Sequence, residues 1–562
     1  MDITQLGTIQ RTYRHANRYR QILAVLIRYG FHEFVQALHI DKYVDLGEAL
    51  TAGGVEVSTL NRWERLRNVI EELGPTFIKI GQVLSTRPDK LPLELVNELQ
   101  KLQDAVPPFP FSEVRAIIEL EFGRPIAEVF AQFEEPPLAA ASIGQVHRAI
   151  LNTGEVVVVK VRRPAVEQTM AVDLEILYHI AMLAERHVDV LEVQKPAEVV
   201  KELQQTLHEE IDYTREAAHM ERFSRNFEDD PNIRAPIVYR ELCTERILIQ
   251  EYIEGIKVAD LDLLREKGYD LPLIANRGAH AMLRQIFVHG FFHADPHPGN
   301  IFILAGNVIC FIDFGMMGRL PKRARGNLID LLTAIVSDDD AGATDALLAL
   351  TIWTDEPDRN DLEAHVAEFI QTHCVGPLKN IQLGRVLQEM MQQAQRHKLR
   401  IPPNLYLVIK ALSTVEGIGR VLDPEFDVFS EATPVVRKIQ QQRLEPKIVA
   451  KGALRSVRQL GNVIKSLPHE LRSLLHQLKV GKLHIEFEHK GLEKLEHTLD
   501  RITNRVSFSL VLAALLISSS VIIRSGMPPR YHDVSIIGLL GYLLSALMGF
   551  RLLISIWRSG RL

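Results

Sequence analysis

The sequence has few cysteines and no cysteine pair at metal-ligand spacing. Its 562 residues include three cysteines, Cys243, Cys310 and Cys374, and no CxxC motif occurs. We therefore expect neither a disulfide framework nor a structural zinc site, and isolated thiols fit a reducing compartment.

A long apolar run is missing from the N-terminal region, and the chain has no excess of positive charge. The opening sequence MDITQLGTIQRTYRHANRYRQ has no apolar core of the kind found in a cleavable signal peptide, so none is expected. A net charge of −6 argues against a general nucleic-acid binder. No internal repeat or low-complexity tract occurs, and the length predicts two or three folded units.

What the sequence does contain is a concentrated polar motif in Phe291–Gly315, which reads FFHADPHPGNIFILAGNVICFIDFG. His293, Asp295 and Asn300 follow the order H-x-D-x-x-x-x-N, and two apolar runs around a glycine turn lead to Asp313. Two short strands around this turn would bring these side chains to one end of a hairpin. The order matches the catalytic loop and the metal-binding DFG of the protein-kinase signature.

Each polar residue of this motif has an expected role in phosphoryl transfer. Asp295 would orient or deprotonate the attacking hydroxyl or water. Asn300 and Asp313 would hold Mg²⁺ through oxygen atoms, which hard divalent cations prefer. His293 and His297 could instead indicate a transition-metal site, but no further His or Cys has supporting spacing, so we interpret both as structural.

A lysine within a run of valines, VVVVKV, is the candidate phosphate-binding cation. In the kinase pattern, Lys160 grips the α- and β-phosphates and pairs with a glutamate on a helix. Glu216 is the preferred partner, and Glu209 and Glu210 are its competitors. The alternative for Lys160 by itself is a place on the exposed face of an edge strand.

Upstream of this lysine, AAASIGQV occupies the frame of the glycine-rich kinase loop, with alanine at the first two glycine positions. Backbone N–H groups of such a loop approach phosphates closely, and two methyl groups should stiffen it. The predicted ATP-binding residues are Ala139, Ala140, Ala141, Ser142, Ile143, Gly144, Gln145, Val146 and Lys160.

The flanking regions contain candidate membrane contacts. Residues from about Ile9 to His39 predict a basic amphipathic helix, which could lie on an anionic membrane or pack with its basic face in solvent. Val435–Ser466 is strongly basic and would lie near anionic headgroups. Val506–Ile523 and Val534–Ile556 are long and apolar enough to form a transmembrane hairpin. The alternative for these two segments is a pair of buried helices.

Several departures from ordinary kinases together resemble the UbiB family of atypical kinase-like proteins, the ADCK group. Alanines replace loop glycines, the catalytic loop reads HADPHPGN, and a K-x-G-Q motif begins at Lys79 and ends at Gln82. Glu210 and Asp212 form an E-x-D pair just before Glu216. The resemblance covers about residues 61–423, and nearly the whole chain once the apolar segments are included.

This resemblance implies a membrane-anchored protein that binds Mg-ATP and supports ubiquinone biosynthesis. In the family, the K-x-G-Q helix packs over the active site where a protein substrate would lie. This property carries over to Lys79 and Gln82, with Glu210 and Asp212 as their expected polar partners. The implied partners are ATP, membrane lipid, polyprenyl quinone precursors and other ubiquinone-biosynthetic proteins. The implied location is the bacterial inner membrane, with the kinase-like part and both chain ends cytoplasmic.

No clear A-P-E motif follows Gly315, so a platform for polypeptide substrates is not expected. ATPase or lipid-directed activity is therefore favoured over general protein phosphorylation. A non-catalytic, nucleotide-gated scaffold and a true protein kinase are the alternatives.

The expected fold is α+β, an atypical protein-kinase-like two-lobed fold with a helical N-terminal extension and a C-terminal transmembrane helical hairpin. The expected parts are the extension carrying K-x-G-Q (1–135), the N-lobe (136–253), the C-lobe (254–430), a basic membrane-proximal helical linker (431–505) and two transmembrane helices (506–562).

Overall fold

The computed structural model divides the chain into two compact units, Met1–Val449 and Ala450–Leu562. The described residues are 3–38, 60–87, 90–102, 106–187, 195–353, 357–373, 383–428, 431, 434, 437, 492–525, 527–531 and 534–558. The predicted basic segment Val435–Ser466 lies outside them except for residue 437, so its membrane role stays a prediction.

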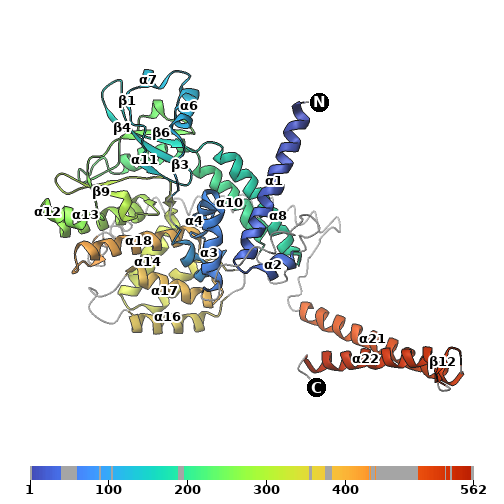
Figure 1. The fold of residues 1–562 in the computed structure, drawn as a ribbon. Coiled ribbons are helices and arrows are strands. Elements are labelled where there is room, and N and C mark those ends of the chain that lie inside the picture. The colour runs from blue at the N-terminus through green and yellow to red at the C-terminus, as the bar shows by residue number, and fades with distance from the viewer. Residues whose placement is uncertain are drawn as a thin grey trace, which may run out of the picture. The chain divides into compact units, whose positions relative to one another are not determined.

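A small antiparallel sheet forms one lobe of the first unit (Figure 1). Its five strands are β1 (Phe130–Phe133), β2 (Ala139–Ala140), β3 (Gly144–Leu151), β4 (Val156–Arg162) and β6 (Ile247–Glu251). Strands β3 and β4 pair antiparallel along their lengths.

Alternation of side chains along β4 separates the two faces of this sheet. One face packs on α6 (Phe111–Phe122) through fully buried valines of β4, namely Val157, Val159 and Val161. Lys160 lies on the other face, where it meets α11 (Tyr213–Asn226). The valine run therefore anchors the sheet and at the same time presents one cation to the second lobe.

The strands of the second lobe surround the predicted motif. Strand β8 (Phe291–His293) pairs with β11 (Met317–Arg319), and β9 (Ile301–Leu304) pairs with β10 (Val308–Phe311). Gly306 and Asn307 have φ of 76° and 58°, so the turn between β9 and β10 uses residues that tolerate the left-handed region. The predicted hairpin is confirmed. Two short strands complete its sheet, β5 (Ile233–Arg234) and β7 (Ile256–Lys257).

Helices make up the rest of this lobe. They are α12 (Leu261–Glu266), α13 (Leu271–Leu283), α14 (Lys322–Val336), α15 (Asp340–Leu350), α16 (Arg359–His373), α17 (Leu383–Arg396) and α18 (Pro403–Leu422). Proline stands at the first position of α18, where its missing N–H costs nothing. Helix α18 packs against α13, which runs into the π-helical segment η5 (Arg284–His289) just before β8.

The N-terminal extension begins with a group of helices that precede α6. They are α1 (Ile3–Arg28), α2 (His32–Ala37), α3 (Arg62–Leu73), α4 (Pro75–Leu84) and α5 (Leu93–Leu99). The single helix predicted over Ile9–His39 is wrong, because the chain turns at Gly30 with φ of 82°. Arg18 of α1 forms a 2.7 Å ion pair with the fully buried Asp173, so this part of the basic helix is packed against the body.

Asp173 lies on α8 (Val166–His187), one of two helices that hold the extension in place. The other is α10 (Pro196–Glu210), and α4 packs on both. A Cβ at Gly81 of α4 would collide with the Leu102 side chain and lie 3.3 Å from Ile70, so the glycine of the K-x-G-Q motif permits this close packing.

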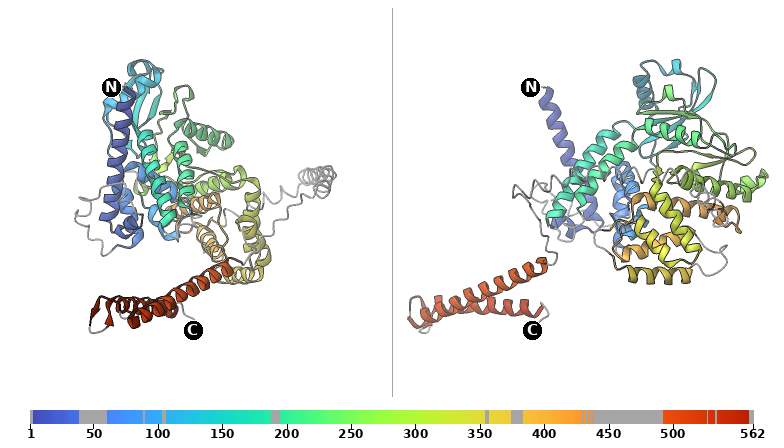
Figure 2. Two further views of the ribbon diagram at one scale, coloured as in Figure 1. Left: turned by 90° about the vertical axis from the view of Figure 1, so that its right-hand side faces the viewer. Right: turned by 180° about the vertical axis from the view of Figure 1, so that it is seen from behind.

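The second unit contains two long helices, α21 (Leu492–Ser525) and α22 (Ile536–Arg558), which lie alongside each other in both views of Figure 2. The short strands β12 (Arg530–Tyr531) and β13 (Val534–Ser535) join them. Gly541 faces Ser519 of α21, as expected for small-residue packing.

By length and apolar composition, one described helical segment can cross a membrane, Val506–Ser525; the apolar part of α22, Ile536–Arg551, is shorter. The two-span membrane hairpin therefore stays a prediction.

Candidate functional site

A cavity of about 650 Å³ brings most of the predicted site residues together. It is lined by residues of the extension, the small sheet and the second lobe. The predicted residues on its wall are Lys79, Gln82, Ala139, Ala141, Ile143, Gly144, Val146, Lys160, Glu210, Glu216, Asp295, Asn300 and Asp313.

Ala140, Ser142, Gln145 and Asp212 are the predicted residues that do not line the cavity. Gln145 is buried on the opposite side of β3, where its side-chain amide bonds both backbone groups of Phe109. Strand alternation explains this placement, because β2 and β3 begin within the loop and turn successive side chains to opposite faces. ATP binding by the loop backbone stays a prediction.

A buried ion pair links the small sheet to α11. Lys160 Nζ lies 2.6 Å from Glu216 Oε1, with 14% and 7% of the two side chains exposed. Asp313 Oδ1 lies 3.9 Å from the same ammonium. Burial alone would lower the pKa of Lys160, but the Glu216 and Asp313 carboxylates outweigh burial and raise it. Lys160 is therefore fully charged, and its contact is with Glu216 rather than with Glu209 or Glu210.

Helix α11 also fixes the backbone beside Asp313. Glu216 Oε1 accepts a 3.2 Å hydrogen bond from the Phe314 N–H, and His219 Nδ1 lies 3.0 Å from the Phe314 carbonyl oxygen. Residues three apart on a helix share a face, so one turn of α11 holds both polar groups of this residue. The cation and the adjacent D-F-G backbone are therefore positioned by the same helix.

The H-x-D segment leaves β8 with its histidine turned inward. His293 is 1% exposed, and its N–H donates to Gln285 Oε1 at 2.9 Å. Burial lowers the pKa of His293, which keeps the ring neutral. His293 Nδ1 accepts from the Asp295 N–H at 3.3 Å, and His297 Nδ1 accepts from the Gly299 N–H at 3.2 Å. Both rings thus have backbone partners that shape the loop.

Asp313 and Asn300 both line the cavity. Asp313 has φ of 63°, a left-handed conformation that aspartate tolerates better than most residues, and its Oδ1 accepts from the Gly315 N–H at 3.3 Å. The Lys160 charge lowers the pKa of Asp313, so the carboxylate is ionised. A carboxylate and an amide carbonyl are oxygen donors of the kind that Mg²⁺ accepts, and both fit the expected ion.

The alanine-containing loop is a tight turn between β2 and β3. The Ala141 N–H donates to the Gly144 carbonyl oxygen at 2.8 Å. A Cβ at Gly144 would lie 2.6 Å from the Val161 carbonyl oxygen and would collide with the Tyr213 hydroxyl. The one glycine retained in this frame is therefore required by close packing of backbone and ring.

The K-x-G-Q helix borders the same cavity. Lys79 Nζ forms a 2.8 Å ion pair with Glu210 Oε2, and both side chains are 12% exposed. Gln82 lines the wall one turn further along α4. Asp212 caps α11, since its Oδ1 accepts from the N–H and hydroxyl of Thr214. Its predicted role beside Lys79 and Gln82 stays a prediction.

Sequence motifs did not identify Lys410, which lies on α18. Its Nζ is 3.2 Å from Asp295 Oδ1, and the lysine lines the cavity. No local pattern marks it, because its partner is far away in the chain. A search for single lysines or arginines in otherwise apolar helices would have found it. Lys410 is the one charged residue among the first thirteen residues of α18.

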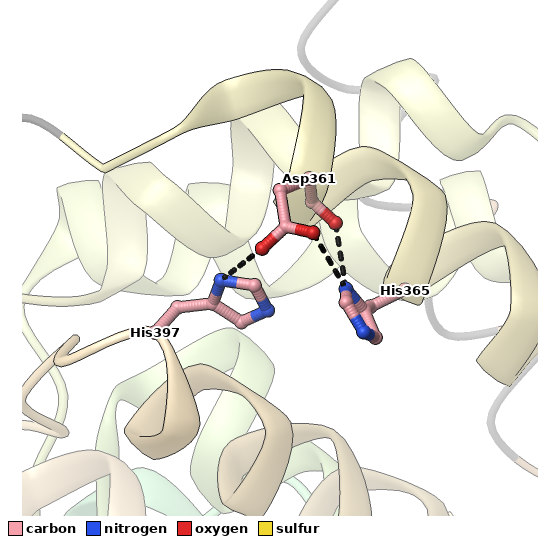
Figure 3. A group of neighbouring side chains, drawn as sticks. All are labelled: Asp361, His365 and His397. Carbon is pink, nitrogen blue, oxygen red and sulfur yellow. Dashed lines mark hydrogen bonds and ion pairs between the residues drawn. The ribbon is translucent and has the colours of Figure 1, made fainter.

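A second group of titratable side chains lies outside the cavity (Figure 3). Asp361 is 3.6 Å from His365 Nδ1 and 3.5 Å from His397 Nδ1, and the Asp361 carbonyl oxygen lies 2.8 Å from His365 Nδ1. Asp361 and His365 are exposed on α16, and His397 follows α17. These contacts tie α16 to the end of α17 at the surface.

Comparison with known proteins identifies the chain's relatives. Residues 101–347 match the ABC1 atypical kinase-like domain, residues 366–427 the UbiB helical domain, and residues 490–558 the ABC1/UbiB kinase-like C-terminal domain. A solved structure, the Rv3197–erythromycin complex from Mycobacterium tuberculosis, has a TM-score of 0.43 at 24% identity and covers 64% of this chain and 95% of its own.

Two curated relatives extend this match. A protein of Clostridium pasteurianum, described as an uncharacterized protein in the hydrogenase 1 5′ region, is 35% identical over 89% of this chain and 94% of its own. A probable protein kinase UbiB from Marinobacter nauticus is 37% identical over 74% of this chain and 75% of its own. On this evidence the chain belongs to the ABC1/UbiB family of atypical kinase-like proteins.

Proposed function

We propose that this protein binds Mg-ATP in the cavity and transfers the terminal phosphoryl group to water or to a small or lipid-like acceptor. As membership of the UbiB family implies, the activity would support ubiquinone biosynthesis, and we place it at the bacterial inner membrane. The acceptor would be a polyprenyl quinone precursor, either phosphorylated directly or presented to other biosynthetic proteins.

The observation that carries this proposal is the set of charges on one wall of the cavity. The cavity is lined by a buried lysine paired with a helix glutamate, and by two carboxylates and an amide. These residues are Lys160, Glu216, Asp295, Asp313 and Asn300. Phosphoryl transfer depends on positioning and electrostatic stabilisation, and these are the groups that the reaction needs.

Each group has a separate task. Lys160, held by Glu216, would bind phosphate oxygens of the nucleotide. Asn300 and Asp313 would hold Mg²⁺, which when bound neutralises charge on the phosphate oxygens. Asp295, 43% exposed, would orient the acceptor O–H and take its proton. The neutral His293 ring would keep the Asp295 backbone in place through the bond to the Asp295 N–H.

The extension supports a small acceptor. Lys79 and Gln82 line the cavity from α4, and Gln100 and Leu102 line it from the residues just after α5. The Lys79–Glu210 ion pair belongs to the same wall, so an extended polypeptide would have to displace it. This arrangement favours water or a lipid headgroup over a protein side chain.

Membrane attachment would come from the second unit. Large apolar side chains are exposed along both of its helices, for example Leu510 at 72% and Leu543 at 65%. Exposed apolar surface of this extent marks a site that contacts another apolar phase, and Val506–Ser525 is long enough to enter a bilayer.

The test is phosphate release by the full-length protein reconstituted in liposomes with and without polyprenyl phenol. Asp295→Asn should lower release by about 10²–10⁴-fold if Asp295 handles the proton. Asp262→Asn, at a fully exposed aspartate on α12, is the matched control and should leave release unchanged. Asp295→Asn protein as active as wild type would refute the catalytic assignment.

The same preparation separates the alternatives. A nucleotide-gated scaffold would bind ATP without phosphate release in any lipid, and a true protein kinase would transfer labelled phosphate efficiently to added proteins. Metabolite profiling of a deletion strain tests the pathway: accumulation of a quinone precursor is expected, and an unchanged quinone pool would contradict it.

A further inference from the structure

Lys410 places a positive charge beside the predicted catalytic loop, which has no lysine or arginine of its own. The loop from His293 to Asn300 reads HADPHPGN and contains no lysine or arginine. The ammonium that contacts its carboxylate comes instead from α18, with Lys410 Nζ 3.2 Å from Asp295 Oδ1. The Lys410 side chain is 19% exposed, and both residues line the cavity.

A cation is needed there because charge accumulates on the transferring phosphoryl group. During transfer, the oxygens of the phosphoryl group must lie between the nucleotide and the acceptor. The acceptor is oriented by the Asp295 carboxylate of the loop. Lys160 is already engaged by Glu216 at 2.6 Å and Asp313 at 3.9 Å, on the side of the small sheet. Among the described residues, Lys410 supplies the ammonium group that contacts Asp295.

Its helix is held so that the ammonium stays in this place. Tyr406 precedes Lys410 by four residues, so the two share a face of α18. The Tyr406 hydroxyl accepts a 2.8 Å hydrogen bond from Gln100 Nε2, which also lines the cavity. Packing of α18 on α13 adds support from the lobe's core.

We propose that Lys410 binds the terminal phosphate of ATP and remains on its oxygens during transfer, supplying from α18 the charge that the catalytic loop lacks. This inference rests on the proposed function and assigns one further residue to it. In the step itself, the bond from the γ-phosphorus to the bridging oxygen breaks and a bond to the acceptor oxygen forms. The acceptor proton goes to Asp295, ADP leaves with the bridging oxygen, and Lys410 contributes charge without changing bonds.

The test is the ratio of affinities for a triphosphate and a diphosphate. The full-length protein in detergent with Mg²⁺ is titrated with ADP and with a non-hydrolysable ATP analogue by calorimetry. Lys410→Ala should weaken the analogue roughly tenfold or more while leaving ADP affinity unchanged, since a charge-assisted hydrogen bond to the terminal phosphate is lost. Lys410→Arg should keep most of the preference.

Lys257→Ala is the matched control, because Lys257 lines the same cavity and carries the same charge but lies on β7. It should change both affinities by the same factor. A preserved triphosphate preference in Lys410→Ala, or equal loss of both ligands, would overturn the inference and identify a structural ion pair.

Failure of the proposed function has a different signature, because the wild-type protein would then bind neither nucleotide or would bind ATP without releasing phosphate. Lys410→Met retains the length of the side chain and serves as the neutral variant if Lys410→Ala does not fold. The same ratio of affinities is measured for this variant. Loss of the preference for the triphosphate supports the assignment, and its retention refutes it.

Discussion

Removal of the Lys160 charge should make the stability of the first unit depend on pH through Glu216. In the native protein the Glu216 carboxylate is 7% exposed and is stabilised by Lys160 at 2.6 Å and the Phe314 N–H at 3.2 Å. Burial already raises the pKa of Glu216, with Lys160 as the main opposing charge. Lys160→Met would leave a buried carboxylate with the Asp313 carboxylate as neighbour, so its pKa should rise further.

The size of the effect follows from the cost of an unpaired buried charge. Breaking a buried ion pair by removing one partner costs about 3–5 kcal/mol. Glu216 can avoid this cost by binding a proton, at about 1.4 kcal/mol per pH unit. A folded pKa above the unfolded value gives stability that is present at low pH and lost as pH rises through the folded pKa. Lys160→Met should therefore be markedly less stable at pH 8 than at pH 6.

Glu216→Gln should cost less than Lys160→Met. Asp313 remains 3.9 Å from the ammonium, and because Coulomb attraction falls inversely with distance it retains about two-thirds of the attraction that Glu216 exerts at 2.6 Å. The double variant has no charge in this pair and should be more stable than Lys160→Met alone.

The assay is denaturant unfolding of the full-length protein at pH 6, 7 and 8, following the first transition. The wild type and the single and double variants form a double-mutant cycle. The reasoning would be refuted if Lys160→Met lowers the free energy of unfolding by the same amount at all three pH values, and if this loss is additive with that of Glu216→Gln.

Four further outcomes are expected. Gly144→Ala should destabilise the small sheet by about 1–3 kcal/mol and weaken ATP binding, because its Cβ would meet Val161; Gly417→Ala in α18, where nothing lies within 4 Å, is the control. Tyr406→Phe should cost about 1 kcal/mol in urea unfolding through the lost Gln100 bond; no change would show that this bond does not hold α18. Burial lowers the pKa of His293, so this group favours the folded state above about pH 6.5 and should cost up to roughly 1.4 kcal/mol per unit as pH falls below it; His293→Gln protein with an unchanged acid slope would contradict this. His397→Ala should cost under about 1 kcal/mol without metal; a larger loss appearing when Zn²⁺ is added would identify a metal site at Asp361.

Local patterns in the sequence were sufficient for much of the site. The valine run around Lys160 predicts a strand, and the apolar runs after Asn300 predict a hairpin, because both depend on neighbours in the chain. The choice of Glu216 as the partner of Lys160 came from the order of motifs, and the structure places the two side chains in contact.

Other features depend on information that is not local. Asp212 was interpreted through its spacing from Glu210, although an aspartate just before a helix is also a typical cap, and capping is what its contacts show. Gly30 interrupts a helical pattern that tolerates single glycines elsewhere. Lys410 meets Asp295 only because α18 returns across the second lobe, which no window of sequence contains.

The contacts of α11 with the Phe314 backbone have a consequence for how such a protein could be regulated. Glu216 contacts both the Lys160 ammonium and the Phe314 N–H, and His219 lies on the carbonyl of the same residue. A displacement of α11 would therefore shift the phosphate-binding cation and the backbone next to Asp313 together. A partner, lipid or modification that moves this helix would therefore alter the cation and the metal-binding carboxylate at the same time.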